Sequence, residues 1–343
     1  EIHFVSARDG VQISLARYRA KDSVVGARKQ SATAPVILCH GAFANRVTYD
    51  LGDGRPSLAR YLSQKGHDVW SLELRGHGRS DKPPWLKTVL SSGKNPGGTW
   101  SIQKYIESDL PAALEYVRSV TRAKKVHWVG HSMGGVILYA WLAFHMENAN
   151  QFASIVTLGS ALDHSLPDQV GVSAESEKKM SSTYHSLYVP KEMRSPGQAP
   201  FAWINYIFAP LGGSLFDMFL GFQYSKSSIS RDTAKHLLAN NFESEPWQVV
   251  FEIHTVFSKK NGMLHPTTGL PLLPNLNHSL PVPLLAFAGG CDYQFSPAAV
   301  SRTAHHLAAE DDSRHVRIIV PGEGSEVCYG HYDLLVGSQV SPP

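Results

Sequence analysis

The stretch Gly130-His-Ser-Met-Gly134 places a hydroxyl side chain between two glycines. A mostly apolar run, residues 125–129, precedes it, and an apolar helical pattern follows it from Gly135. A strand that passes through Gly-x-Ser-x-Gly into a helix makes a tight turn, and glycine removes the side chains that would collide there. The first amides of the helix point toward whatever the serine attacks. The pattern predicts that Ser132 is a nucleophile.

A serine hydroxyl needs a histidine base, and the histidine needs a carboxylate that fixes its tautomer. Asp292 follows a predicted strand at 283–288, and His331 follows the last predicted strand, at 315–320. Serine, acid and histidine in this chain order form a known triad arrangement. We therefore expect Ser132, Asp292 and His331 to be catalytic. Asp163, which follows the strand predicted at 153–158, is the alternative acid.

Attack on a carbonyl carbon leaves a negative oxygen that needs preorganised N–H donors. The backbone N–H of Met133, directly after the serine, is one expected donor. The second is expected from the loop after the strand at 35–39, most simply Ala42, with Phe43 as the fallback. Gly41 would let this backbone approach closely, and the structural interpretation of His40 is that it holds the loop.

Short apolar runs alternate with helical patterns along most of the chain. Residues 4–6 and 11–18 predict a hairpin turned at Asp9-Gly10, and parallel strands are predicted at 35–39, 68–74, 125–129, 153–158, 283–288 and 315–320. This alternation predicts an α/β fold with a mostly parallel sheet covered by helices on both faces. The expected catalytic domain comprises residues 1–159 and 281–343. Residues 160–280 are too long for a loop and are expected to form an inserted, largely helical cap.

The predicted cap contains an aromatic and apolar stretch at residues 201–222. Pro210, the glycines at 212–213 and Asp217 argue against a membrane-spanning helix there. We expect Trp203 and Phe208, together with Phe43, to line a substrate pocket. Packing only within the cap, or transient contact with a lipid surface, are the alternatives for this stretch.

The bulk composition narrows the class of partner. The 343 residues are 43% hydrophobic and 18% charged, with a formal net charge of +3, which is too small to indicate nucleic acid binding. No metal cluster, phosphate loop or dinucleotide motif is visible, so no cofactor and no metal are expected. Because no signal peptide is visible, we expect a soluble, cytoplasmic protein. The oligomeric state is open.

Three cysteines are too few for a disulfide framework. Cys39, Cys291 and Cys328 are expected to be free thiols. A bridge between Cys291 and Cys328, which would tie the acid loop to the histidine loop, is the alternative.

The chain resembles the α/β-hydrolase superfamily over essentially its whole length. Residues 109–113 (DLPAA) upstream of 127–135 (HWVGHSMGG) are similar to the region before the serine in acid lipases, and 289–292 (GGCD) looks like their acid loop. Residues 330–335 (GHYDLL) look like the histidine loop of acid lipases and of polyhydroxyalkanoate synthases. The synthases use a cysteine nucleophile, so Ser132 favours hydrolysis.

Monoacylglycerol-lipase-type enzymes also share the His-Gly-Ala and Gly-His-Ser-Met-Gly strings. The resemblance implies a serine hydrolase that cleaves a carboxylic ester of a lipophilic small molecule through an acyl-enzyme. Hydrolysis of an amide or carbon–carbon bond, or acyl transfer, would use the same triad and is the alternative. A non-catalytic binding protein on the same scaffold is a third possibility, and the complete triad argues against it.

Overall fold

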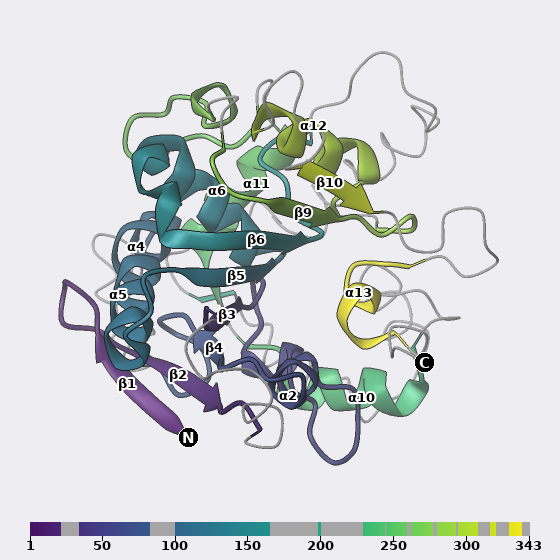
Figure 1. The fold of residues 1–343 in the computed structure, drawn as a ribbon. Coiled ribbons are helices and arrows are strands. Elements are labelled where there is room, and N and C mark those ends of the chain that lie inside the picture. Colours follow the sequence, from purple (N-terminus) through teal and green to yellow (C-terminus); the bar gives the residue numbers. More distant parts are fainter. Residues whose placement is uncertain are drawn as a thin grey trace.

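The structure is a computed structural model, which describes residues 1–21, 34–82, 100–164, 198–199, 229–243, 245–258, 262–276, 280–292, 294–307, 316–319 and 329–337. Within these residues, eight strands form one sheet in the order β1-β2-β4-β3-β5-β6-β9-β10 (Figure 1). The strands are β1 (Ile2–Ser6), β2 (Gln12–Tyr18), β3 (Val36–Cys39), β4 (Val69–Glu73), β5 (Val126–His131), β6 (Phe152–Leu158), β9 (Leu284–Phe287) and β10 (Val316–Ile319).

The predicted hairpin is present at one edge of this sheet. Strand β1 pairs antiparallel with β2, and β2 pairs antiparallel with β4. Gly10 adopts a φ of +85°, which glycine reaches without steric cost, and closes the turn by donating to the Ala7 carbonyl at 2.9 Å. The neighbouring pairs from β4 to β10 are all parallel. The predicted α/β fold with a mostly parallel sheet is confirmed.

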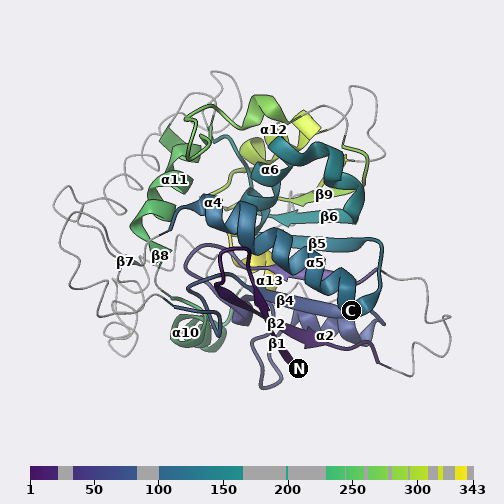
Figure 2. The ribbon, with the colours of Figure 1, turned by 90° about the vertical axis from the view of Figure 1, so that its left-hand side faces the viewer.

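Helices cover both faces of the sheet. Successive residues of a strand point to opposite faces, so each strand contributes to both apolar clusters. In β3, Ile37 and Cys39 belong to the apolar cluster that includes α5, α6 and α12, whereas Val36 and Leu38 belong to the cluster that includes α2, α10 and α13. The two groups of helices accordingly lie on opposite sides of the sheet (Figure 2). Such strands must be apolar at nearly every position, as the sequence is.

The helix predicted from Gly135 is present, as α6, and the described residues form further helices between and after the strands. The helices are η1 (Arg46–Thr48), α2 (Leu58–Gln64), α4 (Ile102–Lys104), η2 (Tyr105–Asp109), α5 (Leu110–Thr121), α6 (Met133–His145), η3 (Met146–Gln151), α10 (Arg231–Asn240), α11 (Trp247–Ser258), η6 (Leu273–Asn275), α12 (Pro297–Leu307) and α13 (Asp333–Val336).

The chain leaves the main sheet after β6 and returns to it at β9. The described residues of this interval contain α10, α11, η6 and a small antiparallel pair of β7 (Gln198–Ala199) with β8 (Glu245–Pro246). This content is consistent with an inserted segment. The bounds 160–280 and its behaviour as a cap stay predictions.

Strands β5 and β6 end on the side of the sheet where α13 lies (Figure 1). Because β5, β6, β9 and β10 are parallel, the loops that follow them all leave from the carboxyl ends of the strands, on this same side. Ser132, Asp292 and His331 all follow such strands. The topology therefore places the predicted site residues at one end of the sheet.

Candidate active site

Ser132 occupies a strained turn between β5 and α6. Its φ of +51° and ψ of −119° fall outside the regions that residues with a Cβ prefer, at a cost of about 1–3 kcal/mol. Its backbone N–H donates to the Leu158 carbonyl at 2.9 Å, which ties the turn to β6. The residue is 8% exposed. A strained residue held by the sheet is the geometry expected of a serine presented for attack.

The two flanking glycines are required by contacts that the turn makes. A Cβ at Gly130 would lie 2.5 Å from the backbone carbon of Gly134, and a Cβ at Gly134 would lie 2.1 Å from the carbonyl oxygen of Cys39. Both distances are far below any real carbon contact. The turn therefore excludes every side chain at these two positions, which gives the Gly-x-Ser-x-Gly pattern its physical reason.

Asp292 and His331 are joined by a short hydrogen bond. Nδ1 of His331 lies 2.7 Å from Oδ2 of Asp292, and both residues are buried. The other carboxylate oxygen, Oδ1, accepts the backbone N–H groups of Gln294 at 2.8 Å and Phe295 at 2.9 Å. These bonds fix the carboxylate, so Nδ1 of His331 carries a proton and Nε2 is left to act as a base.

Aromatic rings pack around the His331 imidazole, with the Tyr332 ring edge-on at a centroid distance of 5.8 Å. Phe295 stacks on the imidazole with ring centroids 5.9 Å apart, and His131 lies 4.6 Å away on a tilted plane. Nε2 of His131 is 3.1 Å from the His331 carbonyl oxygen, which can only accept, so Nε2 donates. Burial, together with the neighbouring His331, holds the pKa of His131 well below its usual value. The neutral ring of His131, the residue before Ser132, thus holds the His331 backbone by donating a hydrogen bond to it.

Gly159, directly after β6, lies against the acid and histidine pair. A Cβ there would lie 2.8 Å from Oδ2 of Asp292 and 2.9 Å from Nδ1 of His331, and the φ of Gly159 is +56°. Gly159 was not predicted from the sequence as a site residue. A glycine at the carboxyl end of a predicted strand beside the elbow was the available signal.

The alternative acid lies elsewhere. Asp163 pairs with Arg302 through atoms 3.3 Å apart, and His331 Nδ1 is bonded to Asp292 instead. Asp333, two residues beyond His331, accepts the backbone N–H of Gly330 at 2.6 Å. The structure brings together the acid and histidine that the sequence selects.

The loop after β3 approaches Ser132 as expected of an oxyanion loop. A Cβ at Gly41 would lie 2.9 Å from Cβ of Ser132, so only glycine fits. Within the described part of the chain, the N–H groups of Ala42 and Met133 make no hydrogen bond. The N–H of Phe43, the fallback donor, is already bonded to Glu245 at 3.1 Å. The geometry thus favours Ala42 over Phe43.

His40 holds this loop through both ring nitrogens. Its Nε2 accepts the Leu74 N–H at 3.2 Å, and its Nδ1 lies 2.8 Å from the Gly41 carbonyl oxygen. An acceptor at one nitrogen and a donor at the other define a neutral imidazole. Burial lowers the pKa of His40 to about 3, which agrees with that state. The bonding matches the structural interpretation of this histidine.

The expectation of three free thiols is wrong for Cys291. Cys39 is free and buried, but Cys291 is disulfide-bonded. Cys328 lies outside the described residues. The acid loop and the histidine loop run side by side, since the Cys291 N–H donates to the Tyr329 carbonyl at 2.8 Å. This proximity of the two loops is what the alternative, a bridge between Cys291 and Cys328, requires.

The predicted pocket residues are only partly described. Phe43 is 8% exposed and packs in a small apolar cluster with Val250 and, around it, Ala42 and Phe242. Trp203 and Phe208 lie outside the described residues. The contribution of these side chains to a substrate pocket stays a prediction.

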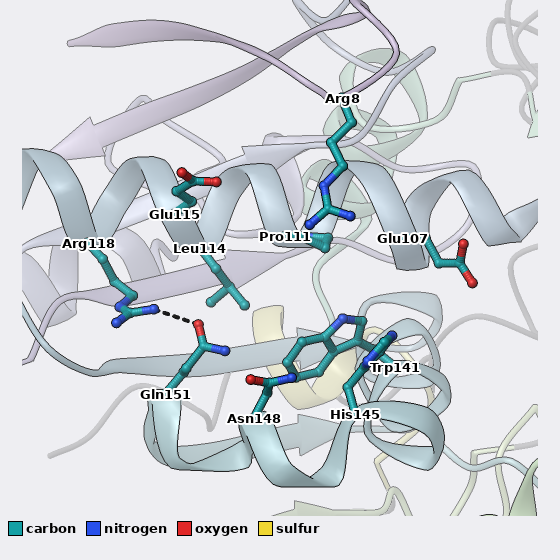
Figure 3. Close-up of a pocket in the computed structure, with 10 residues that line it drawn as sticks. All are labelled: Arg8, Glu107, Pro111, Leu114, Glu115, Arg118, Trp141, His145, Asn148 and Gln151. Carbon is teal, nitrogen blue, oxygen red and sulfur yellow. Dashed lines mark hydrogen bonds between the residues drawn. The ribbon is translucent and has the colours of Figure 1, made fainter.

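A separate cleft of about 630 Å³ lies between α5 and the end of α6 (Figure 3). Trp141 and His145 line it from the last turns of α6, whereas Ser132 precedes the first turn of that helix. Arg118 reaches across to Gln151 in one wall, at 2.5 Å. A helix of this length rises about 20 Å, so the cleft is remote from Ser132.

The described residues contain neither a metal-binding cluster nor a membrane-spanning helix. No group of three histidine, cysteine or acidic side chains there could hold a metal ion. None of the helices in the described ranges combines the length and apolar character needed to cross a membrane.

The sequence is similar to a known protein family and to several lipases. Residues 34–187 match the family described as alpha/beta hydrolase fold. A probable lipase of Schizosaccharomyces pombe is 24% identical over 229 residues, which cover 65% of this chain but only 46% of that protein. The tear acid lipase-like protein of Mesocricetus auratus is 25% identical over 335 residues, covering 91% of this chain and 78% of that protein.

Among solved structures, an esterase from Exiguobacterium antarcticum superimposes with a TM-score of 0.55 at 16% identity, covering 97% of this chain and 93% of the other. At this identity the likeness shows a shared fold. The matched family, the lipase relatives and the sheet topology agree. The chain therefore has the α/β-hydrolase fold, residues 34–187 match that family, and the sequence is similar to those of lipases.

Proposed function

We propose that the protein hydrolyses carboxylic esters through an acyl-enzyme on Ser132. Nε2 of His331 takes the hydroxyl proton as Ser132 attacks the carbonyl carbon, and Asp292 stabilises the imidazolium that forms. His331 then donates that proton to the leaving alcohol. Water, activated by the same imidazole, hydrolyses the acyl-enzyme and restores the serine.

The observation that carries this proposal is the 2.7 Å hydrogen bond between His331 and Asp292. It lies at the sheet edge where the strained Ser132 turn also lies, and the His331 ring contacts the residue next to Ser132. A buried carboxylate that fixes a histidine tautomer near a serine held in a strained turn has a specific use in nucleophilic catalysis.

Two backbone amides are available for the charged oxygen of the tetrahedral intermediate. The Met133 N–H stands at the N-terminus of α6, where the helix dipole favours negative charge. The Ala42 N–H comes from the loop that approaches Ser132 through Gly41. Donors that are already oriented stabilise developing charge without reorganisation.

We propose a lipophilic acyl ester as the substrate. Relatives of this chain include triacylglycerol lipase 1 of Arabidopsis thaliana, which is 30% identical over 163 residues, or 47% of this chain and 39% of that protein. The apolar side chains of Phe43, Trp203 and Phe208 are the proposed acyl contacts. The same triad could cleave an amide or carbon–carbon bond or transfer an acyl group, so substrate choice depends on the inserted segment.

Covalent labelling tests the nucleophile independently of the natural substrate. A fluorophosphonate should add one phosphonyl group to the wild-type protein, located on Ser132 by peptide mass spectrometry, and should not label Ser132→Ala. An unlabelled wild type would contradict the proposal and favour a non-catalytic binding protein. A panel of ester, amide and acyl-acceptor substrates then separates hydrolysis of esters from the alternative reactions.

A further inference from the structure

The loop that approaches Ser132 is clamped by a segment far along the chain. The carbonyl oxygen of Phe43 accepts the backbone N–H of Glu243 at 2.7 Å, and the N–H of Phe43 donates to Oε2 of Glu245 at 3.1 Å. Both backbone polar groups of Phe43 are therefore bonded to the segment between β6 and β9. Ala42, the proposed oxyanion donor, immediately precedes this clamped residue.

Phe43 has a φ of +58°, a backbone conformation that is unfavourable for residues with a Cβ atom. Such a conformation persists only where the surroundings impose it. The two hydrogen bonds from Glu243 and Glu245 supply that constraint. The orientation of Ala42 is consequently set between Gly41, packed on Ser132, and the clamped Phe43.

Glu245 is itself immobilised on three sides. The residue is fully buried, its Oε1 accepts the Tyr105 hydroxyl at 2.5 Å, and its Oε2 lies 3.1 Å from Nε2 of His77. Burial alone would raise the pKa of Glu245, but His77, the Tyr105 hydroxyl and the Phe43 N–H lower it below its usual value. Burial alone would lower the pKa of His77, but Glu245 raises it. Both groups of this buried pair are favoured in their charged forms.

The geometry points to Glu245 as a positioning residue of the oxyanion hole. It fixes Phe43 and thereby aims the Ala42 N–H at the oxygen that becomes charged when Ser132 attacks. This inference rests on the proposed ester hydrolysis and adds that the segment between β6 and β9 supports the catalytic turn. Glu245 does not touch the substrate and acts only through Phe43.

Three substitutions separate the possible contributions of Glu245. Glu245→Leu removes the acceptor and the charge at similar size, Glu245→Gln keeps an oxygen that can accept the Phe43 N–H, and Glu245→Asp keeps the charge but shortens the reach. Glu252→Leu is the matched control. Glu252 is a buried carboxylate of α11 that accepts the Ile102 N–H and the Gln248 side-chain amide, each at 2.6 Å, whereas Glu245 accepts the Phe43 N–H.

Each variant is assayed for kcat and KM on a short p-nitrophenyl ester, with reactive sites counted by end-point fluorophosphonate labelling and folding followed by thermal unfolding. Loss of one oxyanion donor costs about 10²–10³-fold in kcat, so misplacement in Glu245→Leu and Glu245→Asp should cost about 10- to 100-fold, with KM little changed. Glu245→Gln should recover most of this loss. Glu252→Leu should lose stability while keeping kcat per labelled site.

Equal kcat per labelled site in Glu245→Leu and Glu252→Leu would overturn the inference and leave Glu245 a purely structural residue. If Glu245→Leu does not fold, Glu245→Asp decides by the same comparison with Glu252→Leu. Failure of the proposed function is distinguished by Ser132→Ala, which would then hydrolyse the ester as fast as wild type. A wild type that neither hydrolyses esters nor reacts with the fluorophosphonate would overturn both proposals.

Discussion

The carboxylate of Asp292 is bonded at both oxygens before any substrate arrives. One oxygen holds His331 at 2.7 Å, and the other accepts two backbone N–H groups of its own loop. An amide side chain at this position would offer an N–H to one of these partners and disturb the imidazole tautomer. The carboxylate is therefore needed for its charge and for its capacity to accept several bonds.

The acid can be identified by paired substitutions. Asp292→Asn should lower kcat for a p-nitrophenyl ester by up to about 10⁴-fold, because the imidazole is then held in the wrong tautomer. Asp163→Asn should change kcat little, since Asp163 pairs with Arg302. Thermal unfolding of both variants controls for misfolding. The reverse ranking would move the acid to Asp163.

Gly159 tests how tightly the acid and histidine pair is packed. Gly159→Ala should both destabilise the protein and lower kcat, because its Cβ would lie 2.8 Å from Oδ2 of Asp292 and 2.9 Å from Nδ1 of His331. Gly52→Ala is the control, since Gly52 has a φ of +69° with nothing within 4 Å of its Cβ. The backbone strain alone should cost each variant about 1–2 kcal/mol in urea unfolding.

Only Gly159→Ala should lose activity per folded molecule. An equal kcat in the two variants would show that the Gly159 side of the pair tolerates displacement.

At the scale of elements, the strands were predictable because buried parallel strands are continuous apolar runs. The strands before Ser132, Asp292 and His331 were all recognised from that pattern, and parallel topology then brings their loops together. The hairpin at Gly10 was predictable from its turn residues alone. Local patterns sufficed wherever one element carried its own signal.

The clamp on the β3 loop was not predictable for the opposite reason. Phe43 and Glu245 are 202 residues apart, and β8 is a two-residue strand with no periodic pattern. The disulfide of Cys291 could be given from the sequence only as an alternative to a free thiol, because it depends on where two loops meet. Contacts of this range follow from the assembled fold.

The apolar stretch at 201–222 carries a prediction about chain-length preference. If Trp203 or Phe208 contacts the acyl chain, replacement by alanine should shift the preferred acyl length among p-nitrophenyl esters, each buried methylene being worth up to about 0.8 kcal/mol. The measurement is kcat/KM across a series of acyl lengths. An unchanged profile in alanine variants of every aromatic residue from 201 to 222 would exclude the acyl-contact proposal.

At the scale of the whole molecule, the sheet buries several histidines in neutral form. Burial lowers the pKa of His40, His127, His131 and His164. Below their ordinary pKa of about 6.5, the unfolded chain binds protons on these groups that the folded chain does not. The free energy of unfolding should therefore fall as the pH drops from 6.5 to 5. His77, whose pKa is raised, instead contributes stability that is lost as the pH rises above 6.5.

Other buried groups change the free energy of unfolding in the opposite direction as the pH falls, because burial raises the pKa values of Asp109 and Glu252. Replacing a single histidine therefore isolates its own contribution. Relative to His40→Asn, wild type should lose up to about 1.4 kcal/mol more per pH unit in urea unfolding between pH 6.5 and 5. Parallel stability curves for the two proteins would mean that His40 titrates alike in the folded and unfolded chains.

The turnover of Ser132→Ala on short and medium p-nitrophenyl esters shows whether Ser132 is the nucleophile of an ester hydrolase. With unchanged thermal unfolding, kcat should fall by about 10³-fold or more, because loss of any triad member leaves only binding and the oxyanion hole. A folded Ser132→Ala protein that retains most of the wild-type turnover would contradict the account.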